Sequence, residues 1–322
     1  MKTIGVLTSG GDAPGMNACL RALVRKGIFE GLSVMGIERG FRGLIEGKAY
    51  PMPIGSVANI IQRGGTVLRT ARCKEFVNKN GRAKAARFLR NFSIDGLVVI
   101  GGDGSFRGAH ELYQEHKVPV IGIPGTIDND IYGTDYTIGY DTAVNVALES
   151  IDRIRDTASS HDRLFFVEVM GRDAGFIALE VGVGGGAETI LLPETKTDLK
   201  EMCDRIKRGI ARGKTSSIIV VAEGDDAGNA FEIARKVKGV IGMDFRVCVL
   251  GHVQRGGSPT SRDRLLGSTL GAAAVDALLA GETDKMVGIA NDKVVLVPLR
   301  DTWRKKKKIN MDLSRLAEIL SK

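Results

Sequence analysis

Short apolar segments rich in β-branched residues alternate along this chain with longer segments of helical periodicity. The apolar segments are continuous, as in strands that are buried on both faces of a parallel sheet. They occupy residues 4–7, 34–37, 97–100, 118–123, 164–170, 190–192, 218–221 and 247–250. The helical segments include residues 17–30, 105–116, 141–158, 200–212 and 258–279. This alternation, over 322 residues, predicts two doubly wound, Rossmann-like α/β domains with mainly parallel sheets. Asp198, three residues before Glu201, marks the start of one helix.

Glycine is concentrated where the predicted strands end. Glycine makes up 42 of the 322 residues, or 13 %, whereas it makes up about 7 % of an average protein. Six strand ends carry glycine beside a charged or hydroxyl residue, in the stretches that begin at residues 8, 101, 124, 171, 222 and 251. Any one of these could be a structural turn. Together they predict a polar ligand site, because ligands of parallel sheets bind beyond the carboxyl ends of the strands.

Two of these loops are suited to phosphate. In residues 10–15 and 101–104 the glycines leave backbone N–H groups free to bind an anion at the start of a helix. Arg69 and Arg72 could add mobile positive charge, and a solvated surface role is the alternative for each of them. Asp103 is a candidate Mg²⁺ ligand beside the phosphates, or alternatively a helix N-cap.

A third loop, residues 126–130, carries two carboxylates. In an extended segment, Asp128 and Asp130 would point the same way, so that one serves a metal ion and the other takes a proton from a substrate hydroxyl. A metal pair and an Asx-turn are the alternatives.

Charge and cysteine content set the chemical context. The formal charge of +8 attracts anions such as nucleic acid, membrane surfaces or phosphorylated metabolites. The basic run 304–308 is interpreted as a solvated connector, and aromatic residues for base stacking are few. We expect cytoplasmic free thiols, because the cysteines lack metal-ligand spacing and no signal peptide or membrane span is apparent. The cysteines are Cys19, Cys73, Cys203 and Cys248.

Five loops resemble, in order, those of the bacterial ATP-dependent 6-phosphofructokinase family. They are GGDAPGMN at 10–17, GGDGS at 101–105, PGTIDND at 124–130, MGR at 170–172 and GHVQRGG at 251–257. The resemblance extends over about residues 1–300. It implies phosphoryl transfer from Mg-ATP to the 1-hydroxyl of fructose 6-phosphate, a glycolytic step that yields fructose 1,6-bisphosphate and ADP.

The resemblance also assigns residues to the donor. Those expected to bind ATP are Gly11, Arg72, Cys73, Gly102, Asp103, Gly104 and Ser105, with Asp103 on Mg²⁺. Asp128 resembles the catalytic base, and Asp130 would support the metal side. The remaining expected catalytic residues hold the transferring phosphoryl group or the phosphates, and they are Thr126, Arg172, Arg72 and Gly11.

The sugar phosphate is expected to contact a second group of residues. They are Thr126, Ile127, Asp128, Met170, Gly171, Arg172, Glu223, His252, Val253, Gln254 and Arg255. Arg163 and Arg246 look like residues that a neighbouring subunit contributes, which implies a homotetramer with shared active sites. The resemblance places an ATP-binding domain at 1–138 and 256–304. A sugar-phosphate-binding domain with part of an effector site would comprise 139–255 and 305–322.

An effector site for ADP and phosphoenolpyruvate is also implied. Its matching residues are Arg21, Arg25, Arg155, Glu188, Arg212 and Lys214. Three positions depart from the family: Ile54, Asn59 and the pair Thr215–Ser216. Fewer cationic partners predict a retained site with weak phosphoenolpyruvate inhibition.

Other functions fit parts of this sequence less well. A pyrophosphate-dependent phosphofructokinase is disfavoured by Gly104 and Gly125, where those relatives carry Asp and Lys. NAD and lipid kinases share the Gly-Gly-Asp-Gly loop but are not expected to share the 126–130 or 252–257 loops. A silent nucleotide-binding regulator is disfavoured because Asp103 and Asp128 are both present. We expect no nucleic-acid or membrane partner.

Overall fold

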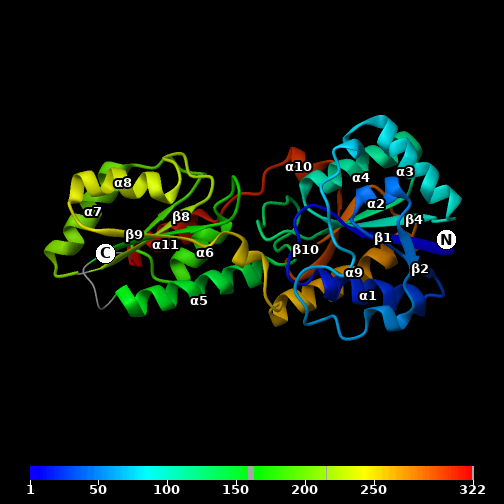
Figure 1. The fold of residues 1–322 in the computed structure, drawn as a ribbon, viewed down its shortest axis with the longest axis horizontal. Helices are drawn as coiled ribbons and strands as arrows, with labels where there is room; N and C mark the ends of the chain where they lie inside the picture. The colour runs from blue at the N-terminus through cyan, green and yellow to red at the C-terminus, as the bar shows by residue number, and fades with distance from the viewer. Residues whose placement is uncertain (159–162, 215, 321–322) are drawn as a thin grey trace. The chain divides into compact units, whose positions relative to one another are not determined.

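The computed structural model describes residues 1–158, 163–214 and 216–320, and the chain divides into two compact units (Figure 1). Unit 1 comprises Met1–Ile127, Ile131–Thr142 and Arg255–Lys307. Unit 2 comprises Asp128–Asp130, Ala143–Gln254 and the chain from Lys308 onward.

Unit 1 is built on a seven-stranded sheet. Its strands lie in the order β11 (Lys293–Pro298), β10 (Lys285–Ala290), β5 (Val120–Pro124), β4 (Gly96–Gly101), β1 (Thr3–Thr8), β2 (Ser33–Ile37) and β3 (Ala49–Pro51). The edge strands β11 and β3 are antiparallel to their neighbours, and the others run parallel. The chain leaves β1 toward β2 on one side and continues to β4 on the other. The order of the strands therefore reverses between β1 and β4, which is where a parallel sheet opens a ligand site.

Helices cover both faces of this sheet (Figure 1). One face carries α1 (Met16–Phe29) and α9 (Ser261–Leu279), and the other carries α2 (Phe41–Glu46), α3 (Lys79–Asn91), α4 (Asp103–His116) and α10 (Asp301–Arg304). Two short 3₁₀ helices, η1 (Ile54–Val57) and η2 (Glu75–Val77), lie between β3 and α3 in the chain. Close packing of α9 on α1 depends on glycine: a Cβ on Gly271 would lie 2.4 Å from the carbonyl oxygen of Cys19. Phe106, Leu89 and Phe41 are among the side chains that fill the core between the sheet and α2–α4.

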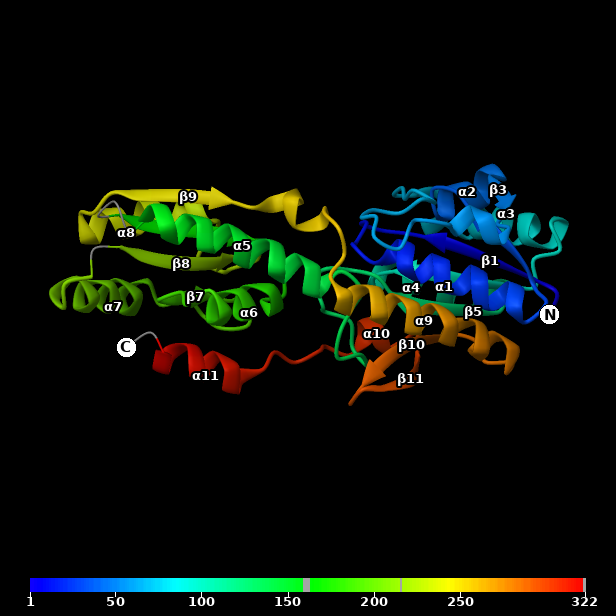
Figure 2. The same cartoon turned by 90° about the horizontal axis from the view of Figure 1, so that it is seen from below.

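Unit 2 contains a fully parallel four-stranded sheet. Its order is β7 (Thr189–Leu191), β8 (Ser217–Ala222), β6 (Leu164–Val169) and β9 (Phe245–Val249). The helices are α5 (Tyr140–Ala158), α6 (Phe176–Gly184), α7 (Leu199–Ala211), α8 (Ala230–Ile241) and α11 (Met311–Leu320), and η3 (Gly251–Arg255) follows β9. Figure 1 shows α7 and α8 on the opposite side of these strands from α5 and α6, and Figure 2 shows β9, β8 and β7 in that order across the sheet. Met202, Ile206 and Ile233 belong to the core between α7, α8 and the sheet.

The predicted fold class is confirmed, and every predicted apolar run overlaps a strand. The expected cap is confirmed as well, because the side chain of Asp198 accepts hydrogen bonds from the N–H groups of Lys200 and Glu201. The strands β3, β10 and β11 were missed. β10 and β11 form a hairpin through Asn291 and Asp292, which both have positive φ, as a two-residue type I′ turn requires. Among the described residues, no helix combines the length and the apolar composition needed to cross a membrane.

Candidate active site

In unit 1 the loops after β1 and β4 lie against each other at the point where the strand order reverses. The N–H of Ser9 donates to the carbonyl of Ile100 at 2.9 Å, and the Ser105 hydroxyl donates to the Ser9 hydroxyl at 2.9 Å. A Cβ on Gly101 would lie 2.5 Å from the Ser9 carbonyl oxygen, so this approach of the two backbones requires glycine. The two glycine-rich loops that the sequence assigned to phosphate are therefore neighbours.

The second of these loops opens directly into a helix. Gly102 is the N-cap of α4, and Asp103 is its first residue. The alternative in which Asp103 is the N-cap is therefore wrong. Backbone N–H groups at this end of α4, together with the helix dipole, favour an anion. No heavy atom of the residues that the structure describes lies within 4 Å of a Cβ built on Gly104, so that position faces open space.

The loop after β5 adjoins the same place. The N–H of Gly125 donates to the carbonyl of Gly101 at 3.0 Å. A Cβ on Gly125 would lie 2.9 Å from both the Ile100 and the Met16 side chains, so this position has no room for a side chain. Thr126 follows at once and is buried, with 7 % of its surface exposed.

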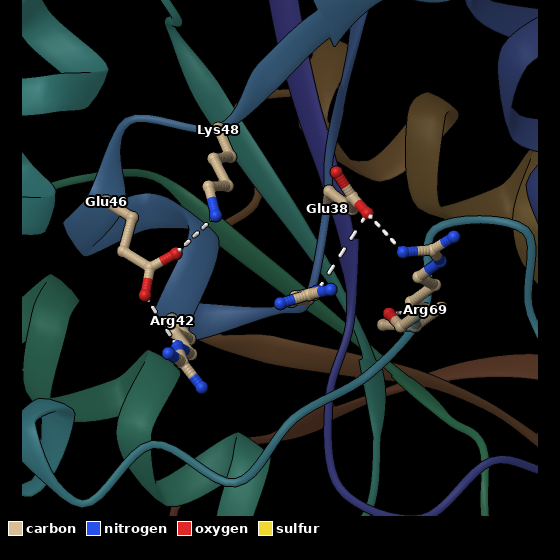
Figure 3. A network of polar contacts seen from close by, with 7 residues as sticks. Glu38, Arg42, Glu46, Lys48 and Arg69 are labelled. Carbon is tan, nitrogen blue, oxygen red and sulfur yellow. Dashed lines mark hydrogen bonds and ion pairs between the residues drawn. The ribbon is translucent and has the colours of Figure 1, made fainter.

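The arginines near this site have different surroundings. Arg72 is exposed, and Cys73 packs against the core of unit 1. Arg69 pairs with Glu38, 3.2 Å away (Figure 3). The Arg69 side chain is 65 % exposed and shares Glu38 with Arg39, so it has an acidic neighbour at the surface, whereas in the described part of the chain no carboxylate pairs with Arg72. Figure 3 also shows Glu46 between Arg42 and Lys48, and hydrogen bonds from these two cations lower the pKa of Glu46 to about 2.

Arg255 lies over the first glycine loop. Its Nη1 donates to the carbonyl of Asp12 at 3.4 Å, and a Cβ on Gly11 would be 2.7 Å from the same nitrogen. Gly11 thus leaves space for this guanidinium, which brings a cation to a loop suited to phosphate.

In unit 2 the central pair is Asp128 and Arg172. The Asp128 side chain is buried, and its Oδ2 lies 3.2 Å from Nε of the half-exposed Arg172. The chain turns at residues 127–128, and Asn129 has φ = 54°. The expectation of an extended segment with Asp128 and Asp130 pointing the same way is therefore wrong, and of the two carboxylates only that of Asp128 is fully buried.

Loops after three strands of unit 2 fix the position of Arg172. Its backbone is left-handed, with φ = 53°, and its N–H donates to Oε2 of Glu223 at 3.2 Å. A Cβ on Gly224 would lie 2.3 Å from the Arg172 carbonyl oxygen. Gln254 is fully buried, and its Oε1 accepts from the N–H of Met170 at 2.8 Å. A strained residue that is held from several sides is typical of a functional site.

Other expected substrate residues lie in these same loops. Gly171 has φ = 150°, and His252 and Val253 are exposed on η3. Arg163 and Arg246 lie elsewhere: Arg163 precedes β6, and Arg246 is the second residue of the parallel strand β9. Six residues of β6 separate Arg163 from the loop at Met170, which is about 20 Å of extended chain.

Most of the expected effector residues of unit 2 gather beside β7. A small pocket is lined by Glu188, Arg212 and Lys214, and Lys214 Nζ is 3.3 Å from Oε1 of Glu188. Arg155 donates to the carbonyls of Gly185 and Gly186, which lead into this strand. Arg21 and Arg25 are on α1 of unit 1. Ile54, the first residue of η1, and Asn59 belong to unit 1 as well. Thr215 is outside the described residues.

The acid and thiol groups limit what else the site can hold. In the part of the chain that the structure describes, no three His, Cys, Asp or Glu side chains form a metal-binding group. A Mg²⁺ ion that shares its ligands with phosphates needs only one or two carboxylates, and Asp103 at the glycine loop fits this use.

All four cysteines lie within the described ranges and are free, and burial raises the pKa of the Cys19 thiol.

Sequence reasoning missed Asn17. This residue lies in α1 among buried positions such as Met16 and Leu20, and only 1 % of its surface is exposed. A polar side chain on the apolar face of a predicted helix was the available signal, because a buried amide requires hydrogen-bond partners.

The mainly parallel sheet of unit 1 carries glycine loops suited to an anion, and the parallel sheet of unit 2 carries a buried carboxylate paired with an arginine. These are the parts of an α/β phosphotransferase. The phosphofructokinase family profile matches residues 3–278. The chain is 57 % identical over 321 residues to ATP-dependent 6-phosphofructokinase 1 of Thermus thermophilus, and 54 % identical over 331 residues to the ATP-dependent 6-phosphofructokinase of Halothermothrix orenii. Both matches cover 100 % of each chain. The chain belongs to the phosphofructokinase family.

Solved structures agree with this assignment. Phosphofructokinase from Saccharomyces cerevisiae superposes with a TM-score of 0.90 at 35 % identity, and the match covers 100 % of this chain and 48 % of the yeast chain. A pyrophosphate-dependent phosphofructokinase from Marinobacter aquaeolei superposes with a TM-score of 0.86 at 23 % identity, over 97 % of this chain and 86 % of the other. The second likeness shows a shared fold alone.

Proposed function

We propose that this chain is an ATP-dependent 6-phosphofructokinase, which transfers a phosphoryl group from ATP to the 1-hydroxyl of fructose 6-phosphate in glycolysis. The observation that carries the proposal is the buried Asp128 carboxylate, 3.2 Å from Arg172, in the segment that continues directly from Thr126. A carboxylate and a guanidinium on one acceptor site supply what phosphoryl transfer needs from side chains: a proton acceptor and a countercharge for the phosphoryl group.

The donor binds to unit 1 in this proposal. Backbone N–H groups of residues 10–12 and 102–105 bind the phosphates of ATP, and Arg72 adds an exposed cation. Gly102, Gly104, Ser105 and Cys73 are the further residues that bind the nucleotide. Asp103 would hold Mg²⁺, which neutralises phosphate charge when it is bound.

The acceptor sugar phosphate binds to loops of unit 2, and Arg255, which follows the last of these loops in the chain, is a further expected phosphate ligand. Asp128 takes the proton of the 1-hydroxyl, and Thr126 and Arg172 stabilise the phosphoryl group in transit. Glu223 and Gln254 support this arrangement, since each accepts a hydrogen bond from the backbone of residues 170–172. Residues for sugar contact are Ile127, Met170, Gly171, Glu223, His252 and Val253.

Arg163 and Arg246 act in trans in this proposal. Their distance along the strands from Met170 favours service to a neighbouring subunit, within a homotetramer that shares its active sites. We also place the reaction in the cytoplasm, where free cysteines stay reduced.

A donor assay tests the function. With fructose 6-phosphate and Mg²⁺, we expect ATP to support formation of fructose 1,6-bisphosphate and pyrophosphate at the same concentration to support little. The reason lies in two glycines. Gly104 has no side chain that would crowd the nucleotide, and Gly125 provides no ammonium group for the extra charge of pyrophosphate. Coupled detection of the bisphosphate measures both donors. Turnover with pyrophosphate equal to that with ATP would contradict the assignment.

The effector site gives a second expected result. We propose that ADP and phosphoenolpyruvate bind between subunits, where Glu188, Arg212, Lys214 and Arg155 are ligands and Arg21 and Arg25 are further ones. Since Ile54 and Ser216 provide no cation, phosphoenolpyruvate should inhibit weakly, each lost charge-assisted hydrogen bond costing about 1–3 kcal/mol. Initial rates against fructose 6-phosphate at rising phosphoenolpyruvate measure this. Strong sigmoidal inhibition at low effector concentration would disprove it.

A further inference from the structure

The segment that carries Arg69 and Arg72 has no regular secondary structure. We call residues 63–72 the arginine loop, and it runs as turns and bends between η1 and η2. A ten-residue irregular segment loses its conformational freedom only if contacts outside it hold it in place. The arrangement of Arg72 therefore depends on the groups that bind the backbone of this loop.

Asn17 binds the first half of the loop through both ends of its amide. Its Nδ2 donates to the carbonyls of Arg63, at 3.0 Å, and Gly64, at 3.2 Å. Its Oδ1 accepts from the N–H of Val67 at 2.8 Å. Three of the four hydrogen bonds available to an amide thus go to one loop.

The second half of the loop is bound by the end of β1 and its glycine turn. The Thr8 hydroxyl donates to the carbonyl of Arg69 at 2.8 Å, and the Thr70 hydroxyl donates to the carbonyl of Gly10 at 2.7 Å. Leu68, which lies between Val67 and Arg69, is fully buried. Arg69 has φ = 58°, and its side chain turns to Glu38 (Figure 3).

Arg69 and Arg72 consequently differ. Arg69 is paired with a carboxylate, whereas no ion pair is present for Arg72 within the described residues. Arg63, at the start of the loop, is exposed without an ion pair among the described residues as well, but Arg72 is the one that lies next to the segment bound to the glycine loop. Because Thr70 is hydrogen-bonded to Gly10, the residues before Arg72 are tied to the glycine loop itself.

We infer that Asn17 is a positioning residue that holds the arginine loop in the conformation that presents Arg72 to the phosphates of the nucleotide. Thr70 performs the same task at the other end of the loop. The inference rests on the proposed function, in which Arg72 binds ATP. Asn17 itself is buried and touches the loop backbone, so it acts through Arg72.

Kinetics of the full-length enzyme test this inference. In Asn17→Asp the Val67 N–H keeps its acceptor, but a carboxylate oxygen faces two carbonyls. In Thr70→Val the shape remains and the bond to Gly10 is lost. We expect both variants to lower kcat/KM for ATP about tenfold or more, since small displacements of a phosphate ligand are costly. Val24→Ala, also buried on α1, should lower stability and leave that ratio near the wild-type value.

A double-mutant cycle shows whether Asn17 acts through Arg72. In an Arg72→Ala background, Asn17→Asp should add less than a further threefold loss, because the residue that it positions is gone. Full additivity of the two losses would overturn the inference, as would wild-type nucleotide kinetics in Asn17→Asp when Arg72→Ala is impaired.

Hydrogen exchange provides a readout without any substrate. In Asn17→Asp and Thr70→Val, amides of residues 64–72 should exchange faster, while those of β4 stay protected as in the wild type. Unchanged exchange in this loop would overturn the positioning role, whatever reaction the protein catalyses. An inactive wild-type protein would contradict the proposed function, and the exchange result would still decide whether Asn17 orders the loop.

Discussion

Asp128→Ser is expected to lower turnover about 10²- to 10⁴-fold, the usual contribution of a positioned general base. The carboxylate is buried and lies 3.2 Å from Nε of Arg172, so its loss removes both the proton acceptor and the countercharge of that guanidinium. Serine is smaller and neutral at this place. A coupled assay at saturating ATP and fructose 6-phosphate measures the effect, and we expect the KM for fructose 6-phosphate to change much less than kcat.

Asp173→Ser is the matched control for this variant. Asp173 is also acidic and follows Arg172 directly, but it is exposed. It should therefore retain wild-type turnover. If Asp128→Ser turned over as fast as Asp173→Ser, Asp128 would not be the base.

The strand ends were predictable from the sequence because each depends on local chemistry. Glycine beside a polar residue after a continuous apolar run marks a place where the backbone must approach something closely. At Gly101 the cause is visible, since a Cβ there would meet the Ser9 carbonyl. At Gly104 no heavy atom of the described residues lies within 4 Å of an added Cβ, so packing inside the protein does not require glycine there.

Errors and omissions arose where distant residues decide the conformation. The turn at residues 127–128 and the left-handed Asn129 are not encoded by the spacing of two carboxylates. Arg69 pairs with Glu38, which is 31 positions earlier, and sequence spacing gives no sign of that contact. Asn17 was overlooked for the same reason, because its partners lie 46 to 50 residues away.

The buried ion pair between α3 and α4 carries the largest stability prediction. Arg82 has 6 % of its surface exposed, and its Nε and Nη2 bind both carboxylate oxygens of Glu115, at 2.7 and 2.6 Å. Its Nη1 also donates to the carbonyls of Phe76, at 3.1 Å, and Val77, at 2.6 Å. Removing the guanidinium leaves the carboxylate and two carbonyls without their donor. Because the Glu115 carboxylate is still 19 % exposed, Arg82→Ala should destabilise the protein by about 1.5–3 kcal/mol.

Thermal or urea unfolding of Arg82→Ala measures this loss, with Arg87→Ala as the control. Arg87 is on the same helix and exposed, so its loss should change stability by at most about 0.5 kcal/mol. The bond from Arg82 lowers the pKa of Glu115, so the pair stabilises the fold above the usual glutamate pKa, near 4.3, and less as the pH falls below it. The difference between Arg82→Ala and the wild type should thus narrow below about pH 4.3. Equal midpoints for Arg82→Ala and Arg87→Ala at pH 7 would show that the ion pair contributes no net stability.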